Sequence, residues 1–493
     1  LESPEVTPAQ VEEDVDPASP AAVAPEQPLR RYAPTLVDAA ALNGNRMDVS
    51  GRHFALTDDR GGVARALASG LEGLGARVRL MEEGARMNGD GHLIHLAPLA
   101  SDGGPDDVRA LFALTQAASP TGLESLCTAT RSSGLAGGAA GFAKSYAKEH
   151  PNSRVRIVHL DPDSDPGVQA ELLLAEICAT DDTLEVSYAG GSRQAVQAAP
   201  LLWSVPDGEV DSPLDSDSVV LITGGARGIA GRVTSGLAQR FGCHFEVVGR
   251  SALPEGDEEA RFNSATSIVD LRRLLIEARS GAAPAEIDAA AREILGAREI
   301  RTTLQAVRSA GGTAHYQSVD VRDRRSFGKC IEQIYDERGR LDGVIHAAGV
   351  IEDKLLTQKT QESFDRVFDT KVLGAHTIAQ NVREDLRFLV FFSSISGAFG
   401  NRGQADYAAA NDHLDKLAHS LSKTHSGRIL SINWGPWEGA GMVGPDLQSE
   451  YERRGIGLIP LEGGVQALVR ELGVRGGGPS QVMLMNADPE QLR

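Results

Sequence analysis

Short apolar runs alternate with longer amphipathic stretches along most of the chain. In the second half the apolar runs are VVLI (219–222), HFEVVG, TAHYQSVDV (313–321), LDGVIHAAG (341–349), LRFLVFFSS (386–394), GRILSINWG (427–435) and QVMLMN. Helical periodicity lies between them, as in ADYAAANDHLDKLAHSLSK. Strands that alternate with helices indicate a parallel sheet. We therefore predict a doubly wound α/β dinucleotide-binding sheet over residues 219–493.

The same alternation occurs earlier, over residues 29–206. Its runs are HFALTDD, the helix-like GGVARALASGLEGLGA, RVRLM, the helix-like FAKSYAKEH and VRIVHLD. KEHPNSRVRIVHLDP resembles KTHSGRILSINWGP at an offset of 274 residues (436 − 162), although α/β repeats also look alike by chance. At this offset Ser133 of the first half corresponds to Tyr407 of the second, and Gly137 corresponds to Asn411. We predict a noncatalytic Rossmann-like structural subdomain, because its first strand also runs into an acidic pair, Asp58-Asp59, that would repel a pyrophosphate.

Three segments interrupt the two α/β patterns. Residues 1–28 are rich in Pro, Ala and acidic residues and predict a disordered linker, and residues 207–218 predict a second, acidic linker. Between Ser251 and Gly312, an insertion of about 252–298 predicts a helical hairpin beside the cofactor site, followed by the crossover helix. Since the first residue is Leu1, we expect a piece of a longer chain.

The net charge of −19 disfavours nucleic acid or an anionic membrane as the main partner, because both bind basic surfaces. The four cysteines are far apart and form no C-x-x-C pair, which indicates reduced thiols and no zinc site. No apolar run is long enough to span a bilayer, and no signal peptide is evident. We therefore expect a cytoplasmic protein that holds no metal.

A glycine-rich loop follows the run VVLI and opens a helix. Glycines let the backbone approach phosphates, and the helix N-terminus offers free N–H groups and a positive dipole end. At the end of the next strand, Arg250 suits the 2′-phosphate of NADPH better than the ribose hydroxyl of NAD, although a single surface arginine decides this. The predicted cofactor residues are Thr223, Gly224, Gly225, Arg227, Gly228, Ile229, Arg250, Ser251, Asp320, Val321, Ala347, Ala348, Gly349, Pro436 and Trp437.

Ser394 and Tyr407 stand 13 residues apart (407 − 394), the spacing of the serine and catalytic tyrosine in short-chain dehydrogenase/reductases. In that superfamily a lysine normally follows the tyrosine by four residues, but here that position is Asn411. Taken singly, such a serine is more often a helix cap and such a tyrosine a core residue. Because the two residues have this spacing and follow a cofactor loop, we interpret them as a catalytic pair rather than as a helix cap and a core residue.

Residues 219–443 resemble the ketoreductase domains of polyketide synthases and polyunsaturated fatty acid synthases. TGGARGIA, VGRS, HAAGVIEDKLL, KVLGAH, FFSSISGAFGNRGQADYAAAND and NWGPWEGAGM carry the resemblance. RRYAPTL, GFAKSYAKEHP and VSYAGGSR resemble the structural subdomain that precedes these domains. The resemblance implies two Rossmann-like subdomains, the second of the short-chain dehydrogenase/reductase type. In this family the lysine and asparagine are exchanged, which assigns the lysine role to Lys371.

The resemblance also implies the chemistry. NADPH would reduce a β-ketoacyl thioester on an acyl carrier protein, with Tyr407 as the proton donor to the ketone oxygen. The Ser394 hydroxyl would form a hydrogen bond with the same oxygen, and Lys371 would lower the pKa of Tyr407. Asn411 would hold Lys371 or a water, while His346 receives no catalytic role and Trp434 is at least as well explained by packing. Partners would be the carrier protein and neighbouring synthase domains. Two alternatives remain, an inactive docking module and a free-standing short-chain alcohol dehydrogenase.

Three residues bear on the substrate and its stereochemistry. Ketoreductases that make the (3R) alcohol carry L-D-D after HAAGV, and only Asp353 of that motif is present here. The opposite class carries a tryptophan where this chain has Phe399. The segment from Trp437 to Met442 would begin a lid over the substrate. We therefore predict a (3R) product, unless Asp353 merely caps the next helix.

Overall fold

The protein is described by a computed structural model over residues 29–492. The description omits residues 43–45, 83, 101–103, 119–121, 132–136, 190, 204–212, 257, 440–444 and 475–477. The predicted linker at 1–28, half of the predicted acidic linker and Met442 lie outside the described residues. None of the described helices is long and apolar enough to cross a bilayer.

The second half forms a parallel sheet with strand order β11-β10-β9-β12-β13-β14-β15. Its strands are β9 (Val219–Thr223), β10 (His244–Gly249), β11 (Thr313–Ser318), β12 (Gly343–His346), β13 (Phe388–Ser394), β14 (Arg428–Trp434) and β15 (Gln481–Met485). Its helices are α5 (Gly228–Phe241), α8 (Arg324–Arg338), α9 (Gln361–Asn381), α10 (Ile395–Phe399), α11 (Ala405–Leu421), α12 (Pro445–Arg453) and α13 (Leu461–Leu472). The prediction of a doubly wound α/β sheet is confirmed here, because every apolar run named above contains a strand.

The first half repeats this arrangement in the order β3-β2-β4-β5-β6-β7. Its strands are β2 (His53–Thr57), β3 (Arg77–Met81), β4 (His92–His95), β5 (Ser125–Arg131), β6 (Arg154–Leu160) and β7 (Glu185–Ser187), and its helices are α1 (Val63–Gly73), α2 (Pro105–Ala117), α3 (Ala139–Glu149) and α4 (Pro166–Cys178). Adding 274 to the bounds of β6 gives those of β14. The offset seen in the sequence therefore relates two strands at the same position in the two halves.

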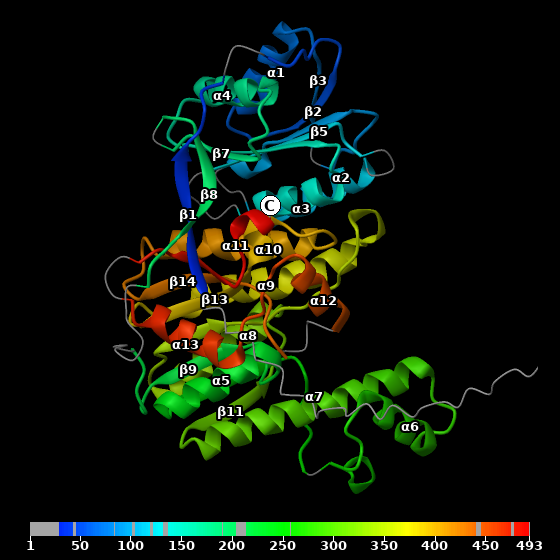
Figure 1. Cartoon of the computed structure of the whole chain (residues 1–493), viewed down its shortest axis with the longest axis vertical. Coiled ribbons are helices and arrows are strands. Elements are labelled where there is room, and N and C mark those ends of the chain that lie inside the picture. Colours follow the sequence, from blue (N-terminus) through cyan, green and yellow to red (C-terminus); the bar gives the residue numbers. More distant parts are fainter. Residues whose placement is uncertain are drawn as a thin grey trace, which may run out of the picture.

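Two antiparallel strands join the halves into one sheet, which the sequence did not foresee. β1 (Arg30–Asp38) pairs with β15 through its first residues and with β8 (Gln194–Pro200) along most of its length. β8 also pairs with β7, so the 15 strands form one continuous sheet. Figure 1 shows β1 and β8 running between the upper, blue and cyan half and the lower half.

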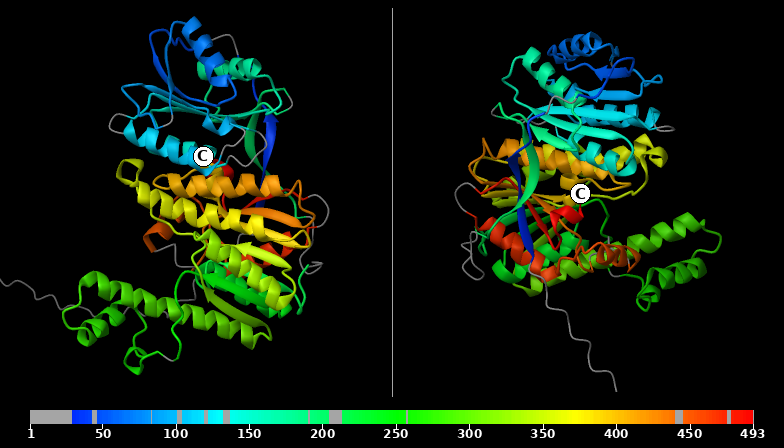
Figure 2. Two further views of the ribbon diagram at one scale, coloured as in Figure 1. Left: turned by 180° about the vertical axis from the view of Figure 1, so that it is seen from behind. Right: turned by 45° about the horizontal axis from the view of Figure 1, so that its top comes forward.

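The halves also pack through helices, with α3 lying against α11 (Figures 1 and 2). Phe112 of α2 stacks on Phe364 of α9 with ring centroids 4.6 Å apart. A Cβ atom on Gly141 would lie 2.3 Å from the carbonyl oxygen of Ala408, so only glycine allows α3 to come this close to α11. The first half thereby supports both helices that carry predicted catalytic residues.

The insertion contains α6 (Ile268–Ala278) and the first part of α7 (Pro284–Ser309). The two helices form a hairpin through a small apolar cluster that includes Leu271, Leu275 and Ile287. In Figures 1 and 2 this hairpin projects from the body. α7 is one continuous helix, because its C-terminal part is also the crossover helix that packs on α5. Four 3₁₀ turns complete the described elements, at Ala97–Leu99, Ala260–Phe262, Leu356–Gln358 and Pro489–Gln491.

Candidate active site

The four predicted catalytic residues come from three elements that meet at the carboxyl end of the second sheet. Ser394 is the last residue of β13, and its Oγ accepts a hydrogen bond from the Ser396 backbone at 3.2 Å, which caps α10. Tyr407 and Asn411 lie one turn apart on α11, where the Asn411 Nδ2 donates to the Tyr407 carbonyl at 2.7 Å. Lys371 reaches the same place from α9.

Lys371 lies beside Tyr407, and its side chain is buried. Its Nζ is 5.5 Å from the centroid of the Tyr407 ring and donates to the carbonyl oxygen of Phe392 at 2.7 Å. A Cβ atom on Gly349 would come within 3.2 Å of the Lys371 Cε, so the glycine after β12 leaves room for this side chain. A lysine from another helix thus occupies the place where a lysine four residues after the tyrosine would be expected.

The protonation equilibria of this pair are set mainly by burial. Burial raises the pKa of Tyr407 to about 12, while hydrogen bonding with the side chains of Asn411 and Ser394 lowers it. Burial also lowers the pKa of Lys371 to about 8, against an opposing effect of Asp415. We expected Lys371 to lower the pKa of Tyr407. In this structure the Lys371 ammonium is hydrogen-bonded to a backbone carbonyl, and burial is the largest influence on the pKa of the tyrosine, so the expected effect of Lys371 stays a prediction.

Asn411 has one unsatisfied atom. Its Oδ1 is buried and has no hydrogen-bond partner among the described residues. An unpaired buried acceptor is costly, which is why such atoms are usually bonded to protein or water. The amide therefore offers a free acceptor in the site, compatible with the expected role of holding a lysine or a water.

A cavity of about 190 Å³ lies beside this site, over the glycine loop. Its lining includes the predicted residues Gly224, Gly225, Arg227, Arg250, Ser251, Asp320, Val321, Ala348 and Gly349. Gly224 and Gly225 have positive φ angles of 109° and 68°, a conformation that favours glycine. No side chain caps the N-terminus of α5 at Arg227, so among the described groups its first N–H groups remain open to a phosphate. These features fit a dinucleotide.

The charged side chains at the cavity differ in whether they already form hydrogen bonds or ion pairs within the protein. Arg250 is exposed, and the structure gives its side chain no hydrogen bond or ion pair with a described residue. Arg227 pairs with Glu299 of α7 at 2.6 Å, and the Asp320 carboxylate accepts from Arg322 at 2.7 Å. Sequence reasoning missed Tyr316, which lines the cavity and donates to the Ser251 carbonyl at 2.6 Å.

Some predicted cofactor residues support the cavity without lining it. Thr223 is fully buried, and its Oγ1 lies 2.7 Å from Nδ1 of His346, whose Nε2 is 2.9 Å from the Lys371 carbonyl. Burial lowers the pKa of His346 to about 3, so the ring is neutral and links β9, β12 and α9. The remaining predicted residues outside the cavity lining are Gly228, Ile229, Ala347, Pro436 and Trp437.

Trp437 is a correction to the sequence analysis, since its side chain belongs to the core. Its indole packs against Trp434 with centroids 4.9 Å apart, and a Cβ atom on Gly464 would lie 2.1 Å from the Trp437 ring. Both tryptophans therefore have the packing role that was the alternative for each of them, and the stronger one for Trp434. The described part of the segment after Trp437 resumes at α12.

Two of the predicted stereocontrol residues, Asp353 and Phe399, are among the described residues. Both carboxylate oxygens of Asp353 accept hydrogen bonds from the Gln404 Nε2, at 3.1 and 3.0 Å. Asp353 does not cap the next helix, because α9 is capped by Thr360. Phe399 packs in a small cluster with Tyr451 of α12. The charges of Asp353 and Tyr451 also raise the pKa of Tyr407. Gln404 and Tyr451 carried no motif in the sequence that pointed to this position.

A buried ion pair fixes the start of α11. Lys359 Nζ bonds to the Asp406 Oδ2 at 2.6 Å and to the Glu352 carbonyl at 2.7 Å, and the Asp406 Oδ1 accepts from the Tyr407 backbone at 2.8 Å. Burial raises the pKa of Asp406 to about 6. A lysine 48 positions before the tyrosine (407 − 359) gives no local signal of such a contact.

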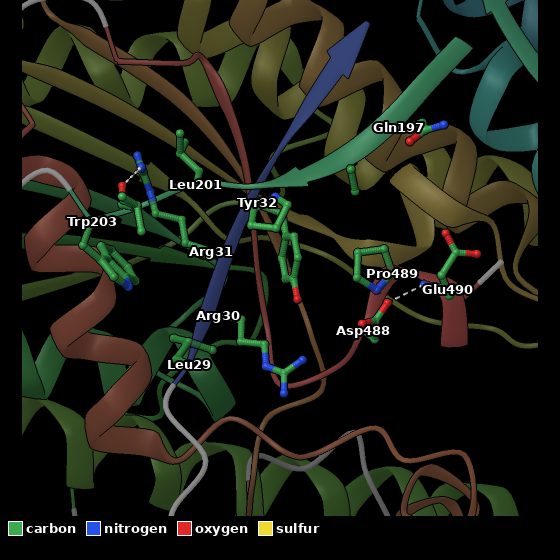
Figure 3. Close-up of a pocket in the computed structure, with 13 residues that line it drawn as sticks. Leu29, Arg30, Arg31, Tyr32, Gln197, Leu201, Trp203, Asp488, Pro489 and Glu490 are labelled. Atoms are coloured by element: carbon green, nitrogen blue, oxygen red, sulfur yellow. Dashed lines mark hydrogen bonds between the residues drawn. The ribbon is translucent and has the colours of Figure 1, made fainter. Parts of the chain in front are cut away.

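A second cavity, of about 590 Å³, lies along β1 and β8 (Figure 3). Its lining includes Arg31, Tyr32, Trp203 and Asp488 but none of the predicted site residues. The Arg31 guanidinium is paired with Glu471, and the Asp488 carboxylate accepts from the Glu490 backbone at 3.0 Å. The described residues also contain no group of three metal-ligating side chains. The cavity over the glycine loop therefore remains the candidate site.

Comparison with known proteins agrees with this geometry. Residues 218–439 match the family described as the KR domain. A polyunsaturated fatty acid synthase polypeptide of Thraustochytrium sp. is 31% identical over 363 residues, which cover 70% of this chain and 13% of that protein. Polyketide synthase PksN of Bacillus subtilis is 26% identical over 371 residues, which cover 73% of this chain and 6% of that protein. The chain thus spans only a small part of the length of these relatives.

Solved structures share the fold of the whole described chain. A ketoreductase domain from the bacillaene assembly line has a TM-score of 0.70 at 22% identity, covering 94% of this chain and 98% of that one. A ketoreductase from the first module of phoslactomycin biosynthesis in Streptomyces sp. HK803 has a TM-score of 0.68 at 22% identity, covering 94% of this chain and 95% of that one. The family implies oxidoreductase chemistry with a nicotinamide cofactor. Residues 218–439 belong to the KR domain family, the curated relatives are polyketide and polyunsaturated fatty acid synthases, and the described part of the chain has the fold of solved ketoreductase domains.

Proposed function

We propose that this chain catalyses the NADPH-dependent reduction of a β-ketoacyl thioester on an acyl carrier protein to the (3R)-β-hydroxyacyl thioester. It acts as one domain of a polyketide or polyunsaturated fatty acid synthase. The observation that carries the proposal is the meeting of Lys371, Ser394, Tyr407 and Asn411 beside a glycine-lined cavity. Both synthase types occur among the relatives, which supports neighbouring synthase domains as partners.

The residues of this chain have separate tasks in the reduction. NADPH, when bound, supplies the hydride. The Tyr407 hydroxyl donates a proton to the ketone oxygen as negative charge develops there, and the Ser394 hydroxyl donates a hydrogen bond to the same oxygen. The Lys371 ammonium, 5.5 Å from the Tyr407 ring centroid, stabilises the phenolate that remains. The free Oδ1 of Asn411 accepts from a water that returns a proton to the tyrosine.

NADPH is favoured over NADH by the charge at the end of β10. Arg250 lines the cavity and is free to form a bidentate contact with a phosphate. An NAD-preferring site of this fold normally carries an acidic residue near this position, to bond the ribose hydroxyls.

The (3R) outcome is supported by the walls of the cleft. The hydrogen bonds from Gln404 to Asp353 tie the loop after β12 to the residues just before Tyr407. Glu352, which departs from the L-D-D pattern, is engaged by Arg366 and Ser363. Hydride transfer occurs from one cofactor face, so the side on which the acyl chain enters decides which ketone face is reduced.

The test is NADPH oxidation with a β-ketoacyl thioester of N-acetylcysteamine, followed by the same reaction on a loaded carrier protein. Chiral chromatography should give a dominant (3R) product with both substrates. No oxidation with either substrate would favour the docking-module alternative, and a dominant (3S) product would overturn the stereochemical assignment. Reduction of simple ketones with no preference for thioesters would favour a free-standing dehydrogenase.

A further inference from the structure

A buried carboxylate lies behind the catalytic helix, and the proposed reaction assigns it no task. Asp415 is on α11, two turns after Tyr407, and is 2% exposed. Its Oδ1 accepts from the Ser431 hydroxyl at 2.6 Å, and its Oδ2 accepts from the Asn433 Nδ2 at 2.8 Å and the Gln481 Nε2 at 3.0 Å. All three donors are neutral, and no described cation forms an ion pair with Asp415. Burying a carboxylate without a cation costs free energy, so we expect Asp415 to have a function that offsets this cost.

The Asp415 cluster, defined as Asp415, Ser431, Asn433 and Gln481, is connected to the active site through β13. The Asn433 Nδ2 also lies 2.9 Å from the Ser394 carbonyl and 2.9 Å from the Ser393 hydroxyl. Lys371 also holds this strand end, through the Phe392 carbonyl. The backbone that presents Ser394 is therefore held both by this cluster and by Lys371.

The first half has a matching cluster with a different charge balance. Pairing across the strands places Ile157 opposite Glu185 and Ser431 opposite Gln481, and 431 − 157 is again 274. His159 likewise corresponds to Asn433 (433 − 159 = 274). In the first half the carboxylate of Glu185 has a cation in direct contact, Lys144, whose Nζ lies at 2.8 Å. Its other partner is the His159 Nε2 at 2.8 Å, on a ring whose pKa burial lowers. In the second half the carboxylate of Asp415 forms no ion pair with a described cation. Its negative charge therefore acts on cations that lie farther away.

Asp415 acts on two buried cations, Lys371 and Lys144. The Lys371 ammonium is buried, and Asp415 favours its charged form against burial. The other charged or titratable groups around Asp415 and Lys371 are Lys144 of α3, Asp412 and Tyr407 of α11, and His346 of β12. Lys144 is already paired with Glu185, and His346 is neutral. Asp412 is the other carboxylate on this face, and it accepts from the Gly138 backbone at 2.8 Å, on the side of the first half.

We propose that Asp415 is a positioning residue for the reduction, which keeps the Lys371 ammonium charged and, through Asn433, holds the strand end that presents Ser394. The inference rests on the proposed function, but its principal measurement does not require turnover. This role explains why the two clusters differ in charge. The first half has no counterpart of Lys371, so it needs no carboxylate that keeps such a lysine charged.

The central variant is Asp415→Asn, with Asp412→Asn as the matched control on the same helix. The amide can keep the local hydrogen bonds, because its oxygen accepts from Asn433 and Gln481 while its nitrogen donates to the Ser431 hydroxyl. The chain contains eight lysines, so ¹³Cε-lysine NMR can follow Lys371, with the resonance assigned by its loss in Lys371→Arg. We expect the Lys371 titration to move down by about one pH unit in Asp415→Asn and to stay in place in Asp412→Asn.

The kinetic counterpart is the pH profile of kcat/KM with a diffusible β-ketoacyl thioester. Activity requires charged Lys371, so Asp415→Asn should lose about tenfold at pH 9 and remain within about twofold of wild type at pH 6. A merely structural residue would lower the rate by the same factor at every pH. That result, or an unmoved Lys371 titration, would overturn the proposal.

Two further outcomes are also decisive. If Asp415→Asn does not fold, Asp415→Ser, which is also uncharged, replaces it. Failure of both to fold would contradict the proposal by making Asp415 a residue of stability. If the wild-type chain reduces no β-ketoacyl thioester while the Lys371 titration still shifts in Asp415→Asn, the proposed function fails and the electrostatic link stands.

Discussion

At the carboxyl end of β2, Asp59 closes the N-terminus of α1, whereas at the carboxyl end of β9 a glycine loop leaves the N-terminus of α5 open. The Asp59 carboxylate accepts from the backbones of Gly61, Val63 and Ala64 at 2.9, 3.1 and 2.8 Å. At α5 the equivalent N–H groups have no side-chain cap. The first half thus satisfies with its own carboxylate the donors that the second half can offer to a pyrophosphate.

Other features of the two sheets are shared, so the difference is local. Thr57 and His95 end β2 and β4 with a contact of 3.4 Å, as Thr223 and His346 end β9 and β12 with one of 2.7 Å. The strand orders agree from β3 to β7 and from β10 to β15. A common scaffold can therefore carry a closed helix N-terminus in one half and an open one in the other, depending on a few side chains at the carboxyl ends of its strands.

The largest expected effect tests whether the chemistry belongs to the second half alone. Tyr407→Phe removes the proton donor and should lower kcat about 10²- to 10⁴-fold while leaving NADPH affinity unchanged. The matched control is Tyr146→Phe on α3, whose hydroxyl accepts from the Leu123 backbone at 3.0 Å. It should reduce stability slightly and leave kcat intact. Turnover by Tyr407→Phe close to wild type would contradict the mechanism.

The next effect concerns the open end of the second sheet. Arg250→Asp removes a charge-assisted phosphate contact worth about 1.5–3 kcal/mol. The kcat/KM for NADPH should therefore fall about 10- to 150-fold, with NADH unchanged or improved. Arg279→Asp, at the exposed end of the helical hairpin, controls for the change in net charge. An unaltered ratio of the two cofactors would assign phosphate recognition to another residue, with Arg227 as the first candidate.

A smaller effect is expected where the halves touch. Gly141→Ala places a methyl group against the backbone of α11 and should cost about 1–3 kcal/mol of unfolding free energy, with a loss of activity because α11 carries Tyr407. Gly73→Ala in α1 is the control, since nothing lies within 4 Å of its Cβ position. It should be neutral or stabilising by up to about 1 kcal/mol. Equal effects of the two substitutions in urea denaturation would show that the helix contact is not tight.

The smallest effect should come from the capping carboxylate of the first half. Asp59→Ala exposes the N-terminus of α1 and should cost about 0.5–2 kcal/mol of stability without changing kcat or the stoichiometry of one NADPH per chain. Asp58→Ala provides the comparison, because Asp58 is exposed and its carboxylate accepts from the Arg60 backbone at 3.1 Å rather than from the N-terminus of α1. Calorimetry that found a second nucleotide bound to Asp59→Ala would mean that this carboxylate alone keeps the first half empty.

The sequence by itself determined the features that depend on neighbouring residues. Alternating apolar runs predicted the strands, TGGARGI predicted the cofactor loop, and the spacing of Ser394 and Tyr407 indicated the reaction class. Each of these signals is local, because backbone conformation and helical or strand periodicity are properties of short segments. Lys371 required the family resemblance, since it is separated from Tyr407 by 36 residues (407 − 371).

Only the tertiary structure decided how distant residues meet. It joined the two predicted sheets through β1 and β8, placed the Trp437 indole in the core, set Gln404 against Asp353 and assembled the Asp415 cluster from α11, β14 and β15. A buried polar group has no local signature, because the same residue on an exposed face would leave the same pattern in the sequence. Its role depends on which donors and charges the fold brings within a few ångströms, and that is fixed by packing between segments far apart in the chain.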